Sequence, residues 1–246
     1  MNIIIEGEDK KYYNKKPKGW NPCILGNKKH RDPELNVLPN CVGWAVARFN
    51  HKGDYGECKY LGNTNAENFI TYVKSQHLTL SDTPQVGACM VWHGEGELAG
   101  HVAIVEEAIT VAEVNTSESN WSGKEPYITK KRKKGTNGNW GAGKGLVFKG
   151  FILNPAFPVL IILPAKGVFK KGDKGEDIAK INDWLYSKYK NKKTLGIVFG
   201  SNTETDVKKF QTEAKAKGIY TGKKATIDGK IGTLTLKAMR EEGFKY

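Results

Sequence analysis

Residues 39–49 read Pro-Asn-Cys-Val-Gly-Trp-Ala-Val-Ala-Arg-Phe, and this stretch decides how the first part of the chain is interpreted. Four apolar residues recur at the spacing of one buried helix face: Val42, Ala45, Val46 and Phe49. Asn40 is a good helix N-cap, so the pattern predicts a helix with Cys41 in its first turn. Unpaired backbone N–H groups and the positive end of the helix dipole favour a thiolate there. Cys41 is therefore a candidate nucleophile, and a buried structural cysteine is the alternative.

A candidate base follows in Gly100-His101-Val102-Ala103-Ile104-Val105-Glu106. The β-branched run predicts a strand with His101 at its edge, after a glycine that allows substrate or another backbone to approach. A histidine so placed can take a thiol proton and later protonate a leaving amine, although a strand-edge histidine is often incidental. The other histidines lie in polar or loop-like surroundings that suggest no role: His30, His51, His77 and His93.

The segment 116–121, Thr-Ser-Glu-Ser-Asn-Trp, contains a carboxylate and an amide two residues apart. Glu118 or Asn120 could accept the imidazole N–H and fix its tautomer, which is the third role in a cysteine–histidine system. Alone, the segment would be read as a polar corner between a strand and a loop.

The chain divides near residues 154–167, where Asn154-Pro155, Pro158 and Pro164 interrupt the pattern. Upstream, residues 88–92, 101–106 and 146–153 are predicted strands. Downstream, three helices are predicted: one after a capping box of Asp173 and Glu176, one after a capping box of Ser201 and Glu204, and one over 233–242. Gly200-x-x-Thr203-x-x-x-Val207 is echoed by Gly232-x-x-Thr235-x-x-x-Met239, which suggests two related half-motifs.

The formal net charge of +13 indicates a polyanionic partner, which could be nucleic acid, anionic lipid or wall teichoic acid. Residues 157–246 hold 19 Lys and Arg against 10 Asp and Glu, so the surplus is concentrated there. The basic run 130–134 lacks interleaved aromatic residues and is predicted to be a solvated loop. Cys23, Cys41, Cys58 and Cys89 match neither a zinc finger nor a dense disulfide framework.

Taken together, NCVGWA, GHVAIVE, SESNW and FKGFILNP resemble the CHAP family of cysteine, histidine-dependent amidohydrolases and peptidases, over about residues 20–155. The resemblance implies an α+β, papain-like domain at 1–155, with the nucleophile's helix packed on an antiparallel sheet. It further implies Cys41 as nucleophile, His101 as general base and acid, Glu118 as the orienting residue and Asn120 as an auxiliary polar group. The backbone N–H of Cys41 is the expected oxyanion-hole donor.

After a linker at 156–166, the segments GDKGEDIAKIN, FGSNTETDVKKFQ and IDGKIGTLTLKAM resemble the peptidoglycan-binding domain of wall hydrolases. That resemblance implies a small all-α, three-helix wall anchor at 167–246, with no chemistry of its own. The chain departs from the family's pattern at 188–196 and 215–225, which are longer and more basic.

The combined expectation is a bacteriophage endolysin that cuts an amide bond of peptidoglycan, as an N-acetylmuramoyl-L-alanine amidase or, with the same residues, as an endopeptidase. Two other classes stay open: a metal-dependent amidase using His93, His101 and Cys89 or Glu95, and a non-catalytic basic binding protein. No cofactor is expected to be required, although Asp32, Glu34 and Asn36 alternate as calcium ligands might, with Pro33 against it.

The expected partners are peptidoglycan and anionic wall polymers, with neither nucleic acid nor membrane insertion. The apolar run 158–163 is too short to cross a bilayer, and residues 1–13 lack a signal-peptide core. The sequence therefore predicts synthesis in the host cytoplasm and action at the bacterial wall after release.

Overall fold

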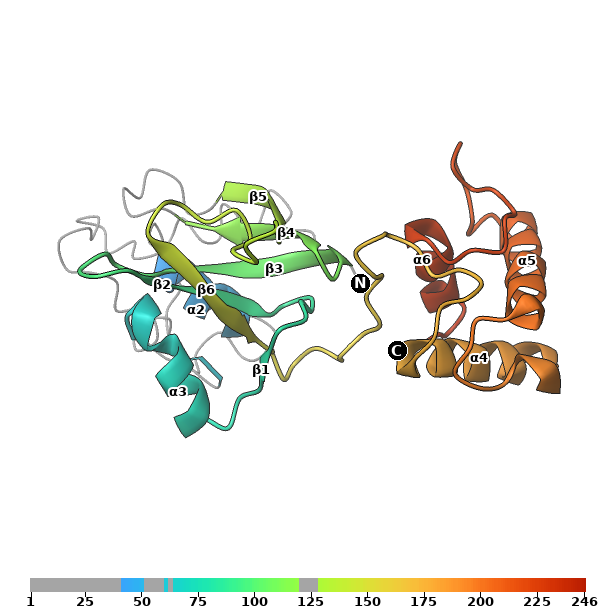
Figure 1. Cartoon of the computed structure of the whole chain (residues 1–246), viewed down its shortest axis with the longest axis horizontal. Coiled ribbons are helices and arrows are strands. Elements are labelled where there is room, and N and C mark those ends of the chain that lie inside the picture. Colours follow the sequence, from blue (N-terminus) through green and yellow to red (C-terminus); the bar gives the residue numbers. More distant parts are fainter. Residues whose placement is uncertain (1–40, 51–59, 62–63, 120–127) are drawn as a thin grey trace, which may run out of the picture. The chain divides into compact units, whose positions relative to one another are not determined.

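The computed structural model describes residues 41–50, 60–61, 64–119 and 128–246 (Figure 1). The chain forms two compact units, of which the first ends at Pro158 and the second runs from Val159 to Tyr246. The division falls inside the predicted linker.

The described part of the first unit is a mixed α/β structure around one antiparallel sheet. The strands lie in the order β1-β6-β2-β3-β4-β5. Their bounds are β1 Leu80–Ser81, β2 Cys89–Gly94, β3 His101–Thr110, β4 Glu113–Glu118, β5 Ile128–Lys133 and β6 Leu146–Ile152. The helical elements are α2 Cys41–Asn50, η2 Ala66–Asn68 and α3 Phe69–Ser75. The predicted helix and the three predicted strands thus appear as α2, β2, β3 and β6.

Alternate residues of the central strands face opposite layers, as the pleat of a sheet requires. Cys89 and Val91 of β2 join α2 and α3 in one apolar cluster, which also contains Trp44 and Phe49. Met90 and Trp92 join a second cluster, which contains Trp140 and Phe151. Because β2 is covered on both faces, its sequence is a continuous apolar run, in contrast to the alternating pattern of a strand with one solvated face.

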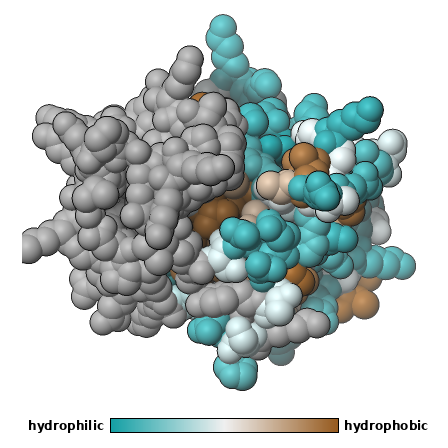
Figure 2. Space-filling view, turned by 90° about the vertical axis from the view of Figure 1, so that its left-hand side faces the viewer, coloured by the Kyte–Doolittle hydropathy of each residue, from teal (hydrophilic) through white to brown (hydrophobic). Residues whose placement is uncertain are grey.

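The basic run 130–134 is not the solvated loop that its charge suggested, because residues 130–133 belong to the edge strand β5. Lys131 and Lys133 form ion pairs with Glu113 of the neighbouring strand, and Arg132 between them is buried. Charged side chains on an edge strand also oppose pairing with other chains. In the face shown in Figure 2, the described surface is mostly hydrophilic, with hydrophobic groups in small separate areas.

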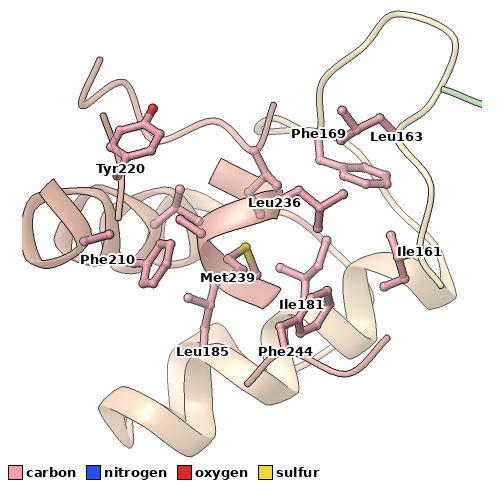
Figure 3. Close-up of a cluster of buried hydrophobic side chains, with 14 of the residues drawn as sticks. Ile161, Leu163, Phe169, Ile181, Leu185, Phe210, Tyr220, Leu236, Met239 and Phe244 are labelled. Carbon is pink, nitrogen blue, oxygen red and sulfur yellow. The ribbon is translucent and has the colours of Figure 1, made fainter. Parts of the chain in front are cut away.

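The second unit contains α4 Glu176–Tyr189, η3 Lys192–Thr194, α5 Ser201–Ala216 and α6 Thr233–Glu241. Its apolar side chains meet in a single core between these helices and the segment that precedes them (Figure 3). Ile161 and Leu163 belong to this core, and Arg240 donates to the backbone carbonyl of Ile161 over 2.6 Å. Residues that the sequence placed in the linker are therefore part of the second unit's packing.

Both predicted capping boxes are wrong. The N-cap of α4 is Gly175, and Asp173 instead accepts hydrogen bonds from Lys166 and from the backbone N–H of Lys170. The N-cap of α5 is Gly200, whose backbone N–H donates to Thr203 Oγ1 over 3.3 Å. Ser201 lies inside the helix. Each of these helices follows a glycine at the N-cap, in place of a capping aspartate or serine.

The two half-motifs suggested by the sequence have matching structures. Gly200 and Gly232 are the N-caps of α5 and α6, with φ of −93° and −97° and ψ of −173° and −171°. A buried amide from the preceding helix meets the threonine three residues later in each case: Asn182 meets Thr203, and Gln211 meets Thr235. Each amide also bonds backbone carbonyls of the loop that leads into the helix. Among the described residues, no helix has the length and apolarity needed to cross a membrane.

Candidate active site

Cys41 is the first residue of α2, and its side chain is half-buried against the cluster that α2 shares with the sheet. The helix is held there because Trp44, Ala45, Val46 and Phe49 are fully or almost fully buried in the same cluster. The thiol is not in a disulfide. The structure therefore places Cys41 at a helix start, while the predicted cap Asn40 lies outside the described residues.

His101 is the first residue of β3, and its register partner on β2 is Trp92. The two rings lie 5.7 Å apart between centroids, with an interplanar angle of 32°. A Cβ on the preceding Gly100 would lie 2.6 Å from the carbonyl oxygen of Trp92 and 3.1 Å from the backbone nitrogen of Glu67. The glycine therefore allows close backbone approach, one of the two reasons that the sequence suggested for it.

The structure brings Cys41, His101 and Glu118 into one hydrogen-bonded chain. His101 Nε2 lies 2.6 Å from Glu118 Oε2, and the ring also hydrogen-bonds Cys41. Because Nε2 is directed at the carboxylate, Nδ1 is the ring nitrogen left for the thiol. Asn120, the alternative orienting group, lies outside the described residues, so the observed partner of the histidine is Glu118.

Glu118 is fully buried in the folded unit, yet its carboxylate has several donors. Arg132 of β5 reaches both oxygens, with Nε 3.0 Å from Oε1 and Nη2 2.6 Å from Oε2. Thr116 Oγ1 donates to Oε1 over 3.2 Å, and Lys130 Nζ lies 3.5 Å from Oε2. A buried carboxylate needs such partners, because an unpaired charge away from water is strongly destabilising.

Arg132 is the residue at this site that the sequence analysis missed. Its guanidinium lies over the Trp92 ring, 4.6 Å from the centroid, and Nη1 donates to the carbonyl oxygens of Trp140 and Gly141. All these contacts require a planar, many-donor cation, which lysine cannot replace. The sequence contained one sign of this role: Arg132 is the single arginine in a run with four lysines. The charge of that run suggested only a solvent-exposed loop.

The pKa values of the site follow from these contacts. Burial lowers the pKa of His101, but hydrogen bonds and charge interactions with Cys41 and Glu118 outweigh it and raise the pKa to about 9. Burial raises the pKa of Glu118, but His101 and Arg132 outweigh it and hold the pKa at about 2. At neutral pH the histidine is therefore an imidazolium and the glutamate a carboxylate.

The other candidates have no comparable setting. Cys89 is completely buried, and burial followed by the charge of Cys41 raises the pKa of its thiol, so it stays protonated and unreactive. Burial and then Lys149 lower the pKa of His93. His77 is exposed after α3. Several other predicted positions lie outside the described residues: Cys23, Cys58, His30, His51, Asp32, Glu34 and Asn36.

Within the described ranges, no three His, Cys, Asp or Glu side chains converge as a ligand set for a metal ion. The set proposed from the sequence, His93 and His101 with Cys89 or Glu95, lies within those ranges and does not converge either. This geometry does not support His93, His101 and Cys89 as the ligands of one metal.

Comparison with known proteins gives one family match. Residues 32–120 match the model of the CHAP domain, a range that contains Cys41, His101 and Glu118. No curated protein sequence matches the chain. Among solved structures, the chain is similar to an N-acetylmuramoyl-L-alanine amidase from Staphylococcus aureus, with 23% identity and a TM-score of 0.33. That similarity covers 46% of this chain and 30% of the staphylococcal one.

Proposed function

We propose that this chain is a cysteine-dependent peptidoglycan hydrolase, with Cys41 as nucleophile, His101 as general base and acid, and Glu118 as the residue that orients the histidine. The observation that carries the proposal is the hydrogen-bonded chain from a cysteine at a helix start, through a histidine at a strand start, to a buried carboxylate. The CHAP match over the same three residues supports it.

In the first half of the reaction, the Cys41 thiolate attacks the carbonyl carbon of an amide, and the electron pair of the carbonyl moves to its oxygen. The backbone N–H of Cys41, at the helix start, is the proposed donor to that oxyanion. The tetrahedral intermediate then expels the amine as the C–N bond breaks, and the His101 imidazolium supplies the proton. The acyl group stays on the sulfur as a thioester.

In the second half, neutral His101 takes a proton from water, and the resulting hydroxide attacks the thioester carbon. The C–S bond breaks, the carboxylic acid leaves, and the thiolate and imidazolium pair is restored. Glu118 stays ionised throughout, because its low pKa means that it stabilises the imidazolium without accepting its proton.

Within this proposal, the bond cut is the amide that joins muramic acid to L-alanine, and a bond inside the peptide is the alternative. The products separate the two: the first leaves new amino termini on L-alanine, and the second leaves them on other residues. Digestion of purified walls followed by end-group analysis is therefore the direct test. No new amino groups at all would contradict an amide hydrolase of either kind.

The second unit is proposed to hold the enzyme on the wall, which would make the chain an endolysin of the bacteriophage type. Support comes from its surplus of Lys and Arg and from its own core of packed helices. Anionic wall polymers would complement such a charge.

The nucleophile is tested by substitution. Cys41→Ser keeps a polar side chain of similar size but loses the thiolate, so wall lysis should fall by several orders of magnitude while the fold is retained. Cys89→Ser is the matched control, because that thiol is buried among apolar side chains and outside the hydrogen-bonded chain. An active Cys41→Ser enzyme would refute the assignment.

A further inference from the structure

A second, separate hydrogen-bonded network joins the same three elements that carry the site residues. Arg48 of α2 donates two hydrogen bonds to the carboxylate of Glu106 on β3, from Nε to Oε1 over 3.0 Å and from Nη2 to Oε2 over 2.9 Å. Ser117 of β4 donates to Glu106 Oε1 over 2.5 Å and accepts from Trp44 Nε1 of α2 over 2.9 Å. The network therefore begins and ends on the nucleophile's helix.

Each member lies a short distance along its element from a residue of the proposed site. Trp44 lies three residues after Cys41 on α2, Glu106 lies five residues after His101 on β3, and Ser117 immediately precedes Glu118 on β4. All of these side chains are buried: Trp44 and Ser117 are 0% exposed, Arg48 6% and Glu106 8%. A few residues of helix or strand backbone therefore join each of these network residues to a residue of the proposed site.

We propose that the Trp44–Ser117–Glu106–Arg48 network is a positioning device that sets the separation of the Cys41 thiol from the His101 ring. This inference rests on the proposed function and concerns the same site. Apolar packing alone holds α2 on the sheet, but it tolerates small shifts along the surface, whereas hydrogen bonds between buried groups fix direction and register. A nucleophile and its base require such precision, since displacements near 1 Å reduce rates by about 100-fold.

The ionic part of the network is not explained by stability alone. A buried ion pair gains little stability over apolar residues of the same volume, because both ions lose their hydration. Breaking the pair at one end is costly, whereas replacing both ends is often neutral. The pair has no net charge, and neither Arg48 nor Glu106 is among the groups that shift the pKa of His101, so the network acts on the histidine through geometry.

The test uses variants that leave the charge unchanged. Ser117→Ala removes the hydroxyl that joins Trp44 to Glu106, and Trp44→Phe removes only the indole donor. The matched control is Asn115→Ala, because Asn115 on β4 bonds Glu107 on β3 over 2.7 Å without reaching α2. The double variant Arg48→Met/Glu106→Leu replaces the ion pair by apolar side chains. It should still fold, because neither charge is left buried without its partner.

Two readouts separate positioning from stability. The first is kcat/KM for wall digestion across pH 6 to 10, whose high-pH limb reports the imidazolium and should lie near pH 9 in the wild type. The groups that face His101 are Cys41 from α2 and Glu118 from β4, with Lys130 and Arg132 of β5 beyond the carboxylate. The second is the alkylation rate of Cys41 at pH 6.5 by iodoacetamide, located by mass spectrometry, which needs no peptidoglycan.

A looser contact between thiolate and imidazolium should lower kcat/KM by roughly 10- to 100-fold. It should also move the high-pH limb down from about 9 toward the ordinary histidine value and slow the alkylation of Cys41. We expect these changes in Ser117→Ala, Trp44→Phe and the double variant, and not in Asn115→Ala.

Unchanged limb position and alkylation rate in folded Ser117→Ala and Trp44→Phe, with a lowered melting temperature only, would overturn the inference and leave a structural role. If wild-type Cys41 reacts no faster than an ordinary thiol and walls are not cut, the proposed function itself fails. The two failures are thus distinguishable.

Discussion

At the scale of single residues, Arg132 explains how a carboxylate stays ionised in a fully buried position. Burial alone would raise the pKa of Glu118, and the fork of the guanidinium, together with His101, reverses the effect. The arginine also limits how Glu118 can move, because Nη1 is bound to two backbone carbonyls. The carboxylate proposed to orient the histidine is therefore itself held by Arg132.

Arg132→Lys is the substitution that separates this geometry from charge. The ammonium keeps the positive charge but cannot occupy both oxygens of Glu118 in the plane of the carboxylate. We expect kcat to fall roughly 10- to 100-fold, the size of losing one charge-assisted hydrogen bond in a catalytic contact, with the fold retained. The measurement is the rate of wall digestion at saturating substrate.

Lys131→Ala is the control for that variant, because Lys131 lies next to Arg132 on β5 and pairs with Glu113 at the exposed surface. An exposed pair of this kind contributes little, so the rate should stay at the wild-type level. Wild-type turnover in Arg132→Lys would show that charge alone, and not the fork, holds Glu118.

At the scale of elements, the helix starts of the second unit depend on tertiary contacts more than on local capping. Thr203 is buried, accepts from the backbone N–H of Gly200 and donates to Asn182 Oδ1 of α4 over 2.9 Å. The sequence indicated Ser201 and Glu204 instead, which fit a capping box in spacing. The predicted capping box does not form, and Thr203 instead both caps the helix and joins α5 to α4.

This difference predicts opposite outcomes for two neighbouring hydroxyl residues. Thr203→Ala should destabilise the second unit by about 1–2 kcal/mol, because it removes a cap and leaves a buried amide oxygen without its donor. Ser201→Ala should stay within about 0.5 kcal/mol of the wild type, because Ser201 is exposed and its side chain caps nothing. Urea unfolding of residues 159–246 measures both, and equal losses would contradict the structural assignment of the cap.

At the scale of the whole molecule, the chain forms two units with separate cores. The first unit contains the hydrogen-bonded chain at Cys41, and the second carries most of the surplus positive charge. Each unit has its own buried apolar cluster, which is the condition for folding alone. The cut between them belongs before Val159, because a fragment that began after the linker would lose the buried Ile161 and Leu163.

A fragment of residues 159–246 should therefore sediment with purified bacterial walls and lyse nothing. Its binding should weaken as salt is raised, to the extent that Lys and Arg are responsible, because screening shortens the range of charge interactions. The full chain carrying Cys41→Ser is the control, since it should bind equally well. A fragment that is folded by circular dichroism yet stays in the supernatant at low salt would refute the anchor.

The sequence by itself determined the features that depend only on residues close together in the chain. Apolar spacing placed α2, β2, β3, β6 and the three helices after residue 167, because periodicity depends on a few neighbouring positions. A cysteine at a helix start and a histidine at a strand start are likewise local features, and so is the carboxylate in 116–121. The prediction that these three residues act together came from their joint resemblance to the CHAP family, and the CHAP-domain match supports that resemblance over residues 32–120.

Only the tertiary structure decided which of these residues meet, and what surrounds them. Arg132 reaches Glu118 across two paired strands, and Arg48 reaches Glu106 between a helix and a strand 58 residues away in sequence. No local pattern records such contacts. The run 130–134 looked like a solvated loop because composition reports charge but not which side chains a sheet buries. The cap of α5 differed from prediction for the same reason, since the buried amide of Asn182 on α4 meets Thr203 in the first turn of α5.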